Sequence, residues 1–246
     1  MTTIVGIKTN YGPEEGIIMG SDTQLSYTDG EGQAWKGRIQ KIIYGQNIML
    51  GHAGLVDRNL YDFQRTFLGQ RKGSSEEITL QLINQAMVNY NKGARYKQIH
   101  FPLFNELNAL ALRENTPISD LHTFLLAINS QKLSLWEIDE FGNLKKSPRI
   151  REFEYLAIGS GSDNALKYID QSVMRAKIDA SKINIPQAID LVVTSLHRAA
   201  EDLNTGDGID VVIMTSSKIT SYGKRISNAL SKAEKEVIDK IKSEFP

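Results

Sequence analysis

The sequence of 246 residues has no cysteine, only four histidines and no long apolar segment. Without cysteine, the chain can form no disulfide bond, thiolate metal site or cysteine nucleophile. The histidines, at positions 52, 100, 122 and 197, match none of the HxxxH or HExxH spacings that bind zinc. No apolar run approaches the roughly 18–20 residues that a membrane span requires. We therefore expect no metal, no cofactor and no membrane partner.

An excess of charge of one sign is also missing. Lys and Arg number 29, Asp and Glu number 29, and the formal net charge is +0. This balance gives no electrostatic basis for binding nucleic acid, and it removes the self-repulsion that keeps many proteins monomeric. The first residues lack the charged and then apolar build of a signal peptide. We expect a soluble, cytoplasmic protein with enough hydrophobic residues, 41% of the chain, to form a core.

The periodicity of the apolar residues predicts groups of strands that alternate with pairs of helices. Strands are expected at 3–7, 17–21, 38–44, 48–54, 123–128, 133–138, 155–158 and 209–214. Helices are expected at 60–68, 78–90, 165–177, 185–201 and 227–245. Because successive strands form hairpins, the sheets should be mostly antiparallel. The expected fold is therefore α+β, a four-layer αββα sandwich, with residues 1–246 as a single domain that ends in the helix at 227–245.

Thr2 is the chemically unusual position. It becomes the first residue when Met1 is removed, and Thr is small enough for that removal to be expected. A terminal Thr carries a hydroxyl and a free α-amine, whose reference pKa of about 7.7–8.0 leaves a neutral fraction that can accept the hydroxyl proton. Many chains begin with Met-Thr and have no catalytic terminus, so the dipeptide alone decides nothing.

Other polar motifs, taken singly, are typical of ordinary structure. Asp22 fits an exposed turn carboxylate, and Lys41 lies in an alternating stretch that fits a surface lysine. The turn Gly159-Ser160-Gly161 is common between a strand and a helix, and Asp202 fits a helix cap. His52 fits a pocket lining or an edge strand. Each reading stays open while the motifs are considered one at a time.

Considered together and in chain order, six short segments resemble proteasome β-type subunits and the HslV peptidase, which are N-terminal-nucleophile hydrolases. The segments are TTIV at 2–5, GSD at 20–22, GRIQKI at 37–42, GHAG at 51–54, AIGSGS at 157–162 and EDLNTGDGID at 201–210. The resemblance extends to about residue 216, and a divergent bacterial or archaeal homologue fits it as well as a mainstream subunit.

The resemblance implies a role for each matching residue. Thr2 would be the nucleophile and its α-amine the base. Asp22 and Lys41 would form a buried ion pair beside it, in which the cation lowers the proton affinity of the amine and the hydroxyl. Gly54 would donate the backbone N–H that stabilises the oxyanion.

Three further residues complete the implied site. Ser160, Asp202 and Thr205 would form a supporting network around the terminal amine. Thr205 stands where the family usually has Ser and keeps the hydroxyl. The bulk of Leu55 and Val56 implies a narrowed pocket for the side chain that precedes the cleaved bond.

The implied function is a threonine-type peptidase acting on protein or peptide substrates. Its hydroxyl would form an ester acyl-enzyme that water hydrolyses. The resemblance further implies a homo-oligomeric ring that encloses the active site, fed by a separate ATPase unfoldase. Two alternatives remain: an amidase or transpeptidase with the same nucleophile, and a catalytically silent ring or scaffold subunit.

Overall fold

The computed structural model describes residues 2–9, 15–28, 34–45, 47–54, 122–139, 143–146, 149–150, 153–175, 182–200, 208–222, 239 and 243. The strands are β1 (Thr3–Thr9), β2 (Gly16–Asp22), β3 (Gln24–Thr28), β4 (Ala34–Arg38), β5 (Ile42–Tyr44), β6 (Ile48–Gly54), β7 (His122–Asn129), β8 (Leu133–Ile138), β9 (Leu144–Lys146), β10 (Arg149–Ile150), β11 (Phe153–Gly159), β12 (Ile209–Thr215) and β13 (Ile219–Ser221). The helices are α4 (Ser162–Arg175) and α5 (Ile185–Ala199).

Two large sheets and one small one contain these strands. The six-stranded sheet has the order β10-β11-β1-β2-β12-β13, and the five-stranded sheet has the order β5-β6-β7-β8-β9. Strands β3 and β4 pair separately. Neighbouring strands run antiparallel in all three sheets. The central strand β1 is paired on both edges, which places the start of the chain inside a sheet.

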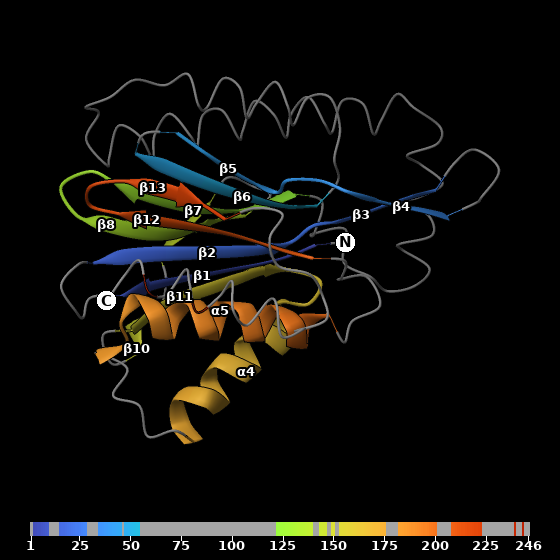
Figure 1. Ribbon diagram of the computed structural model, residues 1–246. Helices are drawn as coiled ribbons and strands as arrows, with labels where there is room; N and C mark the ends of the chain where they lie inside the picture. The colour runs from blue at the N-terminus through green and yellow to red at the C-terminus, as the bar shows by residue number, and fades with distance from the viewer. Residues whose placement is uncertain are drawn as a thin grey trace.

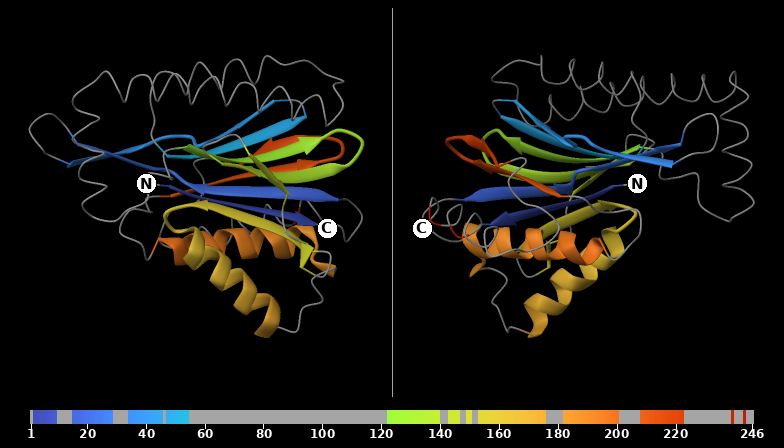
Figure 2. Two further views of the ribbon diagram at one scale, coloured as in Figure 1. Left: turned by 180° about the vertical axis from the view of Figure 1, so that it is seen from behind. Right: turned by 45° about the vertical axis from the view of Figure 1, so that its right-hand side comes forward.

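The two large sheets lie face to face, and α4 and α5 cover the outer face of the six-stranded sheet (Figures 1 and 2). Alternate residues of β1 point to the two sides. Val5 packs with residues of α5 such as Val192, whereas Ile4 packs between the sheets with Met49. Since side chains alternate along a strand, β1 contributes to both cores.

The expected four-layer αββα sandwich is wrong for the part of the chain that the structure describes. The described residues form mostly antiparallel sheets with a single layer of two helices. The helices expected at 60–68 and 78–90 lie outside the described residues. So does the C-terminal helix at 227–245, apart from Asp239 and Ser243, which are helical. Periodicity identifies an apolar stripe on a helix but not the sheet face that the stripe covers, so it could not fix the number of layers.

The strand prediction at 38–44 needs a local correction that matters for the site. Strand β5 begins only at Ile42, while β4 ends at Arg38. Between them, the N–H of Ile39 donates to the carbonyl of Thr23 at 2.9 Å. This contact extends the pairing of β3 with β4 by one position, and the N–H of His52 in β6 then donates to the carbonyl of Lys41, so that Lys41 adjoins the five-stranded sheet.

Helix α5 forms where its sequence signals predict it. Pro186 lies in the first turn, and Asn184 and Gln187 form a reciprocal capping box that satisfies backbone N–H groups at the start of the helix. No helix among the described residues is long and apolar enough to cross a membrane.

Candidate active site at the start of strand β1

Antiparallel pairing gathers several strand ends at one end of the six-stranded sheet. Thr3, at the start of β1, pairs with Gly159, at the end of β11. Asp22, at the end of β2, pairs with Ile209, at the start of β12. Residues far apart in the sequence therefore meet around Thr2, which directly precedes β1.

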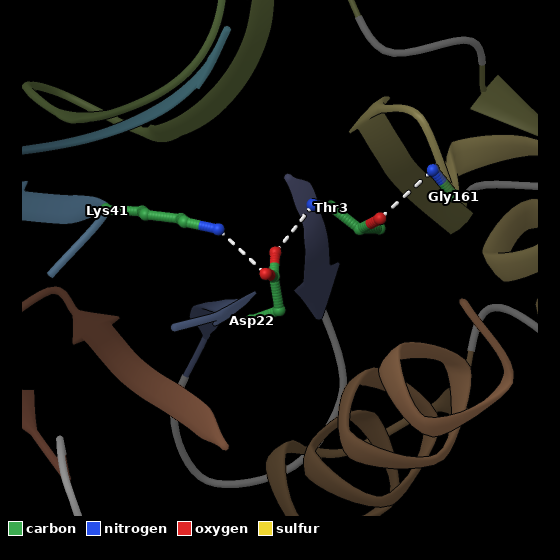
Figure 3. A network of polar contacts seen from close by, with 4 residues as sticks. All are labelled: Thr3, Asp22, Lys41 and Gly161. Carbon is green, nitrogen blue, oxygen red and sulfur yellow. Dashed lines mark hydrogen bonds and ion pairs between the residues drawn. The ribbon is translucent and has the colours of Figure 1, made fainter. Parts of the chain in front are cut away.

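The carboxylate of Asp22 joins this end of the sheet to the second sheet. The backbone N–H of Thr3 donates to Oδ1 of Asp22 at 2.6 Å, and Nζ of Lys41 donates to Oδ2 at 2.7 Å (Figure 3). The side chains of Lys41 and Asp22 are each 3% exposed. A charge-assisted contact of this length, buried on both sides, holds the ammonium next to the first residues of β1.

Burial lowers the pKa of Lys41 below its usual value of 10.5, because the buried site disfavours the charged ammonium. The charge of Asp22, its hydrogen bond and the charge of Asp210 oppose this effect and favour the charged form. Asp210 is buried on β12, opposite Ser21 of β2. Two carboxylates thus favour the charged form of Lys41. Because burial has the larger effect, Lys41 still loses its proton more readily than an exposed lysine.

The turn after β11 holds Thr2 and Thr3 through two hydrogen bonds. The N–H of Ser160 donates to the carbonyl of Thr2 at 3.0 Å, and the N–H of Gly161 donates to Oγ1 of Thr3 at 3.1 Å. Gly159 has a φ of 95°, and a Cβ at this position would lie 1.7 Å from the carbonyl oxygen of Thr2. Only glycine fits so close to another backbone group.

Gly54 ends β6 on the side of Lys41. The N–H of His52 donates to the carbonyl of Lys41 at 3.0 Å. In an antiparallel ladder, backbone groups two residues apart point to the same side of the strand. Gly54 pairs in register with His122. Its N–H therefore points to the same side of β6 as that of His52, and its role as an oxyanion donor stays a prediction.

Among the seven predicted site residues, hydrogen bonds join Asp22 to Lys41 and Ser160 to Thr2, and Gly54 lies at the end of β6. The expected contact between Asp22 and Lys41 is present, and the alternative placing of both on the surface is wrong because both are buried. The catalytic roles stay predictions. Asp202 and Thr205 lie outside the described residues, and so do Leu55 and Val56.

Two details differ from the sequence interpretation. Ser160 is exposed, and it binds the carbonyl of Thr2 with its backbone N–H rather than with its side chain. His52 does not lie on an edge strand, since β6 pairs with both β5 and β7. Its ring packs against that of Phe124 at an interplanar angle of 44°, with centroids 4.9 Å apart.

Thr3 is the residue that sequence reasoning missed. Its amide and hydroxyl both take part in the site, although no local motif singles it out. Only the strand register, which places Thr3 opposite Gly159, reveals it. Among the described residues, no group of three or more His, Asp or Glu side chains is arranged to hold a metal ion.

No protein-family model matches the chain, and no curated protein matches it. Among solved structures, the Gly-1 mutant of Anbu from Hyphomicrobium sp. strain MC1 is similar, with 14% sequence identity and a TM-score of 0.64. The match covers 99% of this chain and 94% of that chain. The chain shares its fold with Anbu. At this identity the likeness shows the fold alone.

The predicted membership of the proteasome β-type and HslV-like family is wrong on these findings, because no family model supports it and the structural likeness is to Anbu. The reason lies in what short motifs encode. Segments such as AIGSGS and GHAG report local backbone geometry, namely a tight turn and a strand end. A shared fold can reproduce that geometry while most other positions change.

Proposed function

We propose that the protein hydrolyses peptide bonds with Thr2 as an N-terminal nucleophile, exposed by removal of Met1. The observation that carries the proposal is the carboxylate of Asp22, which binds both the N–H of Thr3 and the ammonium of Lys41 in a buried position. A buried cation beside a terminal threonine supplies the electrostatics that an activated hydroxyl needs.

In the first half of the reaction, the α-amine of Thr2 accepts the hydroxyl proton while Oγ1 attacks the carbonyl carbon of the substrate. The positive charge of Lys41 lowers the proton affinity of the hydroxyl, and the N–H of Gly54 stabilises the oxyanion. Collapse of the tetrahedral intermediate breaks the C–N bond. The proton held by the α-amine passes to the departing amine, which leaves an ester on Oγ1.

In the second half, the α-amine accepts a proton from water while the water oxygen attacks the ester carbonyl. Breaking the C–O bond releases a carboxylic acid, and the proton returns to Oγ1 of Thr2. A second amine in place of water would give transpeptidation with the same residues. The expected ring-shaped assembly, the separate ATPase and the single-domain organisation stay predictions.

The test compares processed wild-type protein with Thr2→Ala, Thr2→Ser and a form that retains Met1, each checked by intact mass. The wild type should cleave fluorogenic peptides and gain the mass of a peptide epoxyketone. Thr2→Ser should keep part of the activity, because it retains a hydroxyl. Thr2→Ala and the Met1 form should be unlabelled and inert, with melting temperatures near that of the wild type.

Each contrary result has a defined meaning. Equal cleavage by the processed and Met1-retaining forms would remove Thr2 as the nucleophile. A processed wild type that takes no label and cleaves neither peptides nor small amides would indicate a catalytically silent protein. Cleavage of small acyl amides without cleavage of peptides would change the substrate to that of an amidase.

A further inference from the structure

Thr3 has no exposed surface, and its backbone N–H and its hydroxyl bind two different segments of the chain. Its N–H donates to Asp22 at the end of β2, and its Oγ1 accepts from the N–H of Gly161 in the turn after β11 (Figure 3). A Cβ at Gly161 would lie 2.5 Å from Oγ1 of Thr3 and 2.9 Å from Cβ of Ala199. The hydroxyl is thus packed tightly against the turn as well as bonded to it.

The peptide group between Thr2 and Thr3 is held at both of its polar ends. Ser160 donates to the carbonyl oxygen, and Asp22 accepts from the N–H. Because a peptide group is planar, fixing its oxygen and its hydrogen fixes the whole plane and the direction of the bond to Cα of Thr2. These contacts involve only atoms from the Thr2 carbonyl onward, so removal of Met1 breaks none of them.

We propose that Thr3 is a positioning residue for the nucleophile. Its hydroxyl holds the turn at residues 159–161 against β1. The N–H of Ser160, which lies in that turn, thereby keeps its hydrogen bond to the carbonyl of Thr2. The Cα of Thr2, which carries the α-amine and the hydroxyl side chain, is then held in place without any contact between Thr3 and substrate. This inference rests on the proposed function, since it concerns the geometry of the same nucleophile.

The opposite end of β1 supplies a matched control. Thr9 is also buried, and its Oγ1 also accepts a hydrogen bond from a glycine N–H, that of Gly16 at 3.2 Å. It lies at the other end of the same strand. If a buried threonine hydroxyl in β1 matters only for packing and stability, Thr3 and Thr9 should respond alike to the same substitution.

The experiment compares Thr3→Val, Thr3→Ser and Thr9→Val in processed protein. Thr3→Val should lower kcat by about tenfold to a hundredfold with KM nearly unchanged, because a displacement of about 1 Å at a reacting group can cost about a hundredfold. Thr3→Ser keeps the hydroxyl and should recover most of kcat. Thr9→Val should lower the melting temperature and leave kcat unchanged.

Amide hydrogen exchange gives a measurement that does not depend on activity. The Gly161 amide should lose protection in Thr3→Val and keep it in Thr3→Ser. Retained protection in Thr3→Val, or lost protection with wild-type kcat, would overturn the positioning role. An equal loss of kcat in Thr3→Val and Thr9→Val would do the same, because it would show a general effect on stability.

The proposed function fails in a different way. If wild-type protein takes no epoxyketone label at Thr2, the catalytic proposal and the positioning role are both overturned. Hydrogen exchange at Gly161 would still report the contact with Thr3 in that case. A labelled wild type with an unaffected Thr3→Val variant overturns the positioning role alone.

Discussion

The two ends of strand β1 each lie beside a buried pair of opposite charges, but the pairs are built differently. At the far end, Nζ of Lys8 lies 3.6 Å from Oε1 of Glu154, with side chains that are 10% and 2% exposed. At the start of the strand, Lys41 and Asp22 lie 2.7 Å apart and are both 3% exposed. Both pairs carry the cost of removing two charges from water.

The difference lies in how each pair arises. Lys8 and Glu154 are directly opposite each other on the neighbouring strands β1 and β11, so the register of one sheet is enough to join them. Asp22 ends β2 of the six-stranded sheet, whereas Lys41 directly precedes β5 of the five-stranded sheet, so the two residues meet only when these sheets pack together. Asp22 also accepts the N–H of Thr3 beside the start of the chain. A buried ion pair therefore indicates a site only when its surroundings add chemistry, here the threonine that we propose as the nucleophile.

The largest expected effect comes from removing one lysine at a time. Lys41→Met should lower kcat by about a hundredfold to a thousandfold, the usual range for losing one preorganised electrostatic contact. Lys8→Met should leave kcat unchanged. Both variants should lose stability, by about 3–5 kcal/mol for a buried pair that is broken on one side.

Peptidase kinetics and urea unfolding measure both lysine effects. Equal reductions of kcat in Lys8→Met and Lys41→Met would contradict the inference that only the ion pair at the start of β1 serves catalysis. Wild-type kcat in a folded Lys41→Met variant would remove Lys41 from the mechanism.

A smaller effect is expected from adding one methyl group at each end of β1. In Gly159→Ala, the new Cβ meets the Thr2 carbonyl and the positive φ is strained by about 1–3 kcal/mol. In Gly16→Ala, the Cβ would lie 2.9 Å from Cδ1 of Ile185, the movable end of a side chain. We expect Gly159→Ala to lose both stability and kcat and Gly16→Ala to keep kcat, as thermal melts and kinetics will measure. Equal kcat values for the two variants would contradict a specific role of the close contact between Gly159 and the Thr2 carbonyl.

The smallest expected effect is on the pH dependence of the free energy of unfolding, and it concerns the ion pair of Lys41 with Asp22. Because the pKa of Lys41 in the folded protein lies below 10.5, the unfolded chain binds more protons between the two values. The free energy of unfolding of the wild type, relative to Lys41→Met, should therefore rise with pH as the pH passes through the folded pKa toward 10.5. The rise is about 1.4 kcal/mol for each unit by which the pKa is lowered.

Urea unfolding of the two proteins at several alkaline pH values measures this difference. A fall in the difference over the same range would show that attraction to Asp22 outweighs the cost of burial.

Local features, such as strands and their pairing in hairpins, could be predicted from the sequence. The pairing of the strand expected at 3–7 with that at 17–21, and of 38–44 with 48–54, is confirmed by β1 with β2 and by β5 with β6. These predictions succeed because apolar alternation and turn residues act over a few neighbouring positions. The pairing of β3 with β4 was missed, since no strand was expected between residues 21 and 38.

By itself, the sequence determined the candidate chemistry: a threonine at position 2, a carboxylate at 22, a lysine at 41 and glycines at 54 and 159. It also predicted most of the strands that lie next to them. The tertiary structure alone decided that Asp22 and Lys41 are buried and in contact, and that Thr3 belongs to the site. The reason is physical: burial and contact between residues 19 or 158 positions apart depend on sheet register and stacking, which no local pattern encodes.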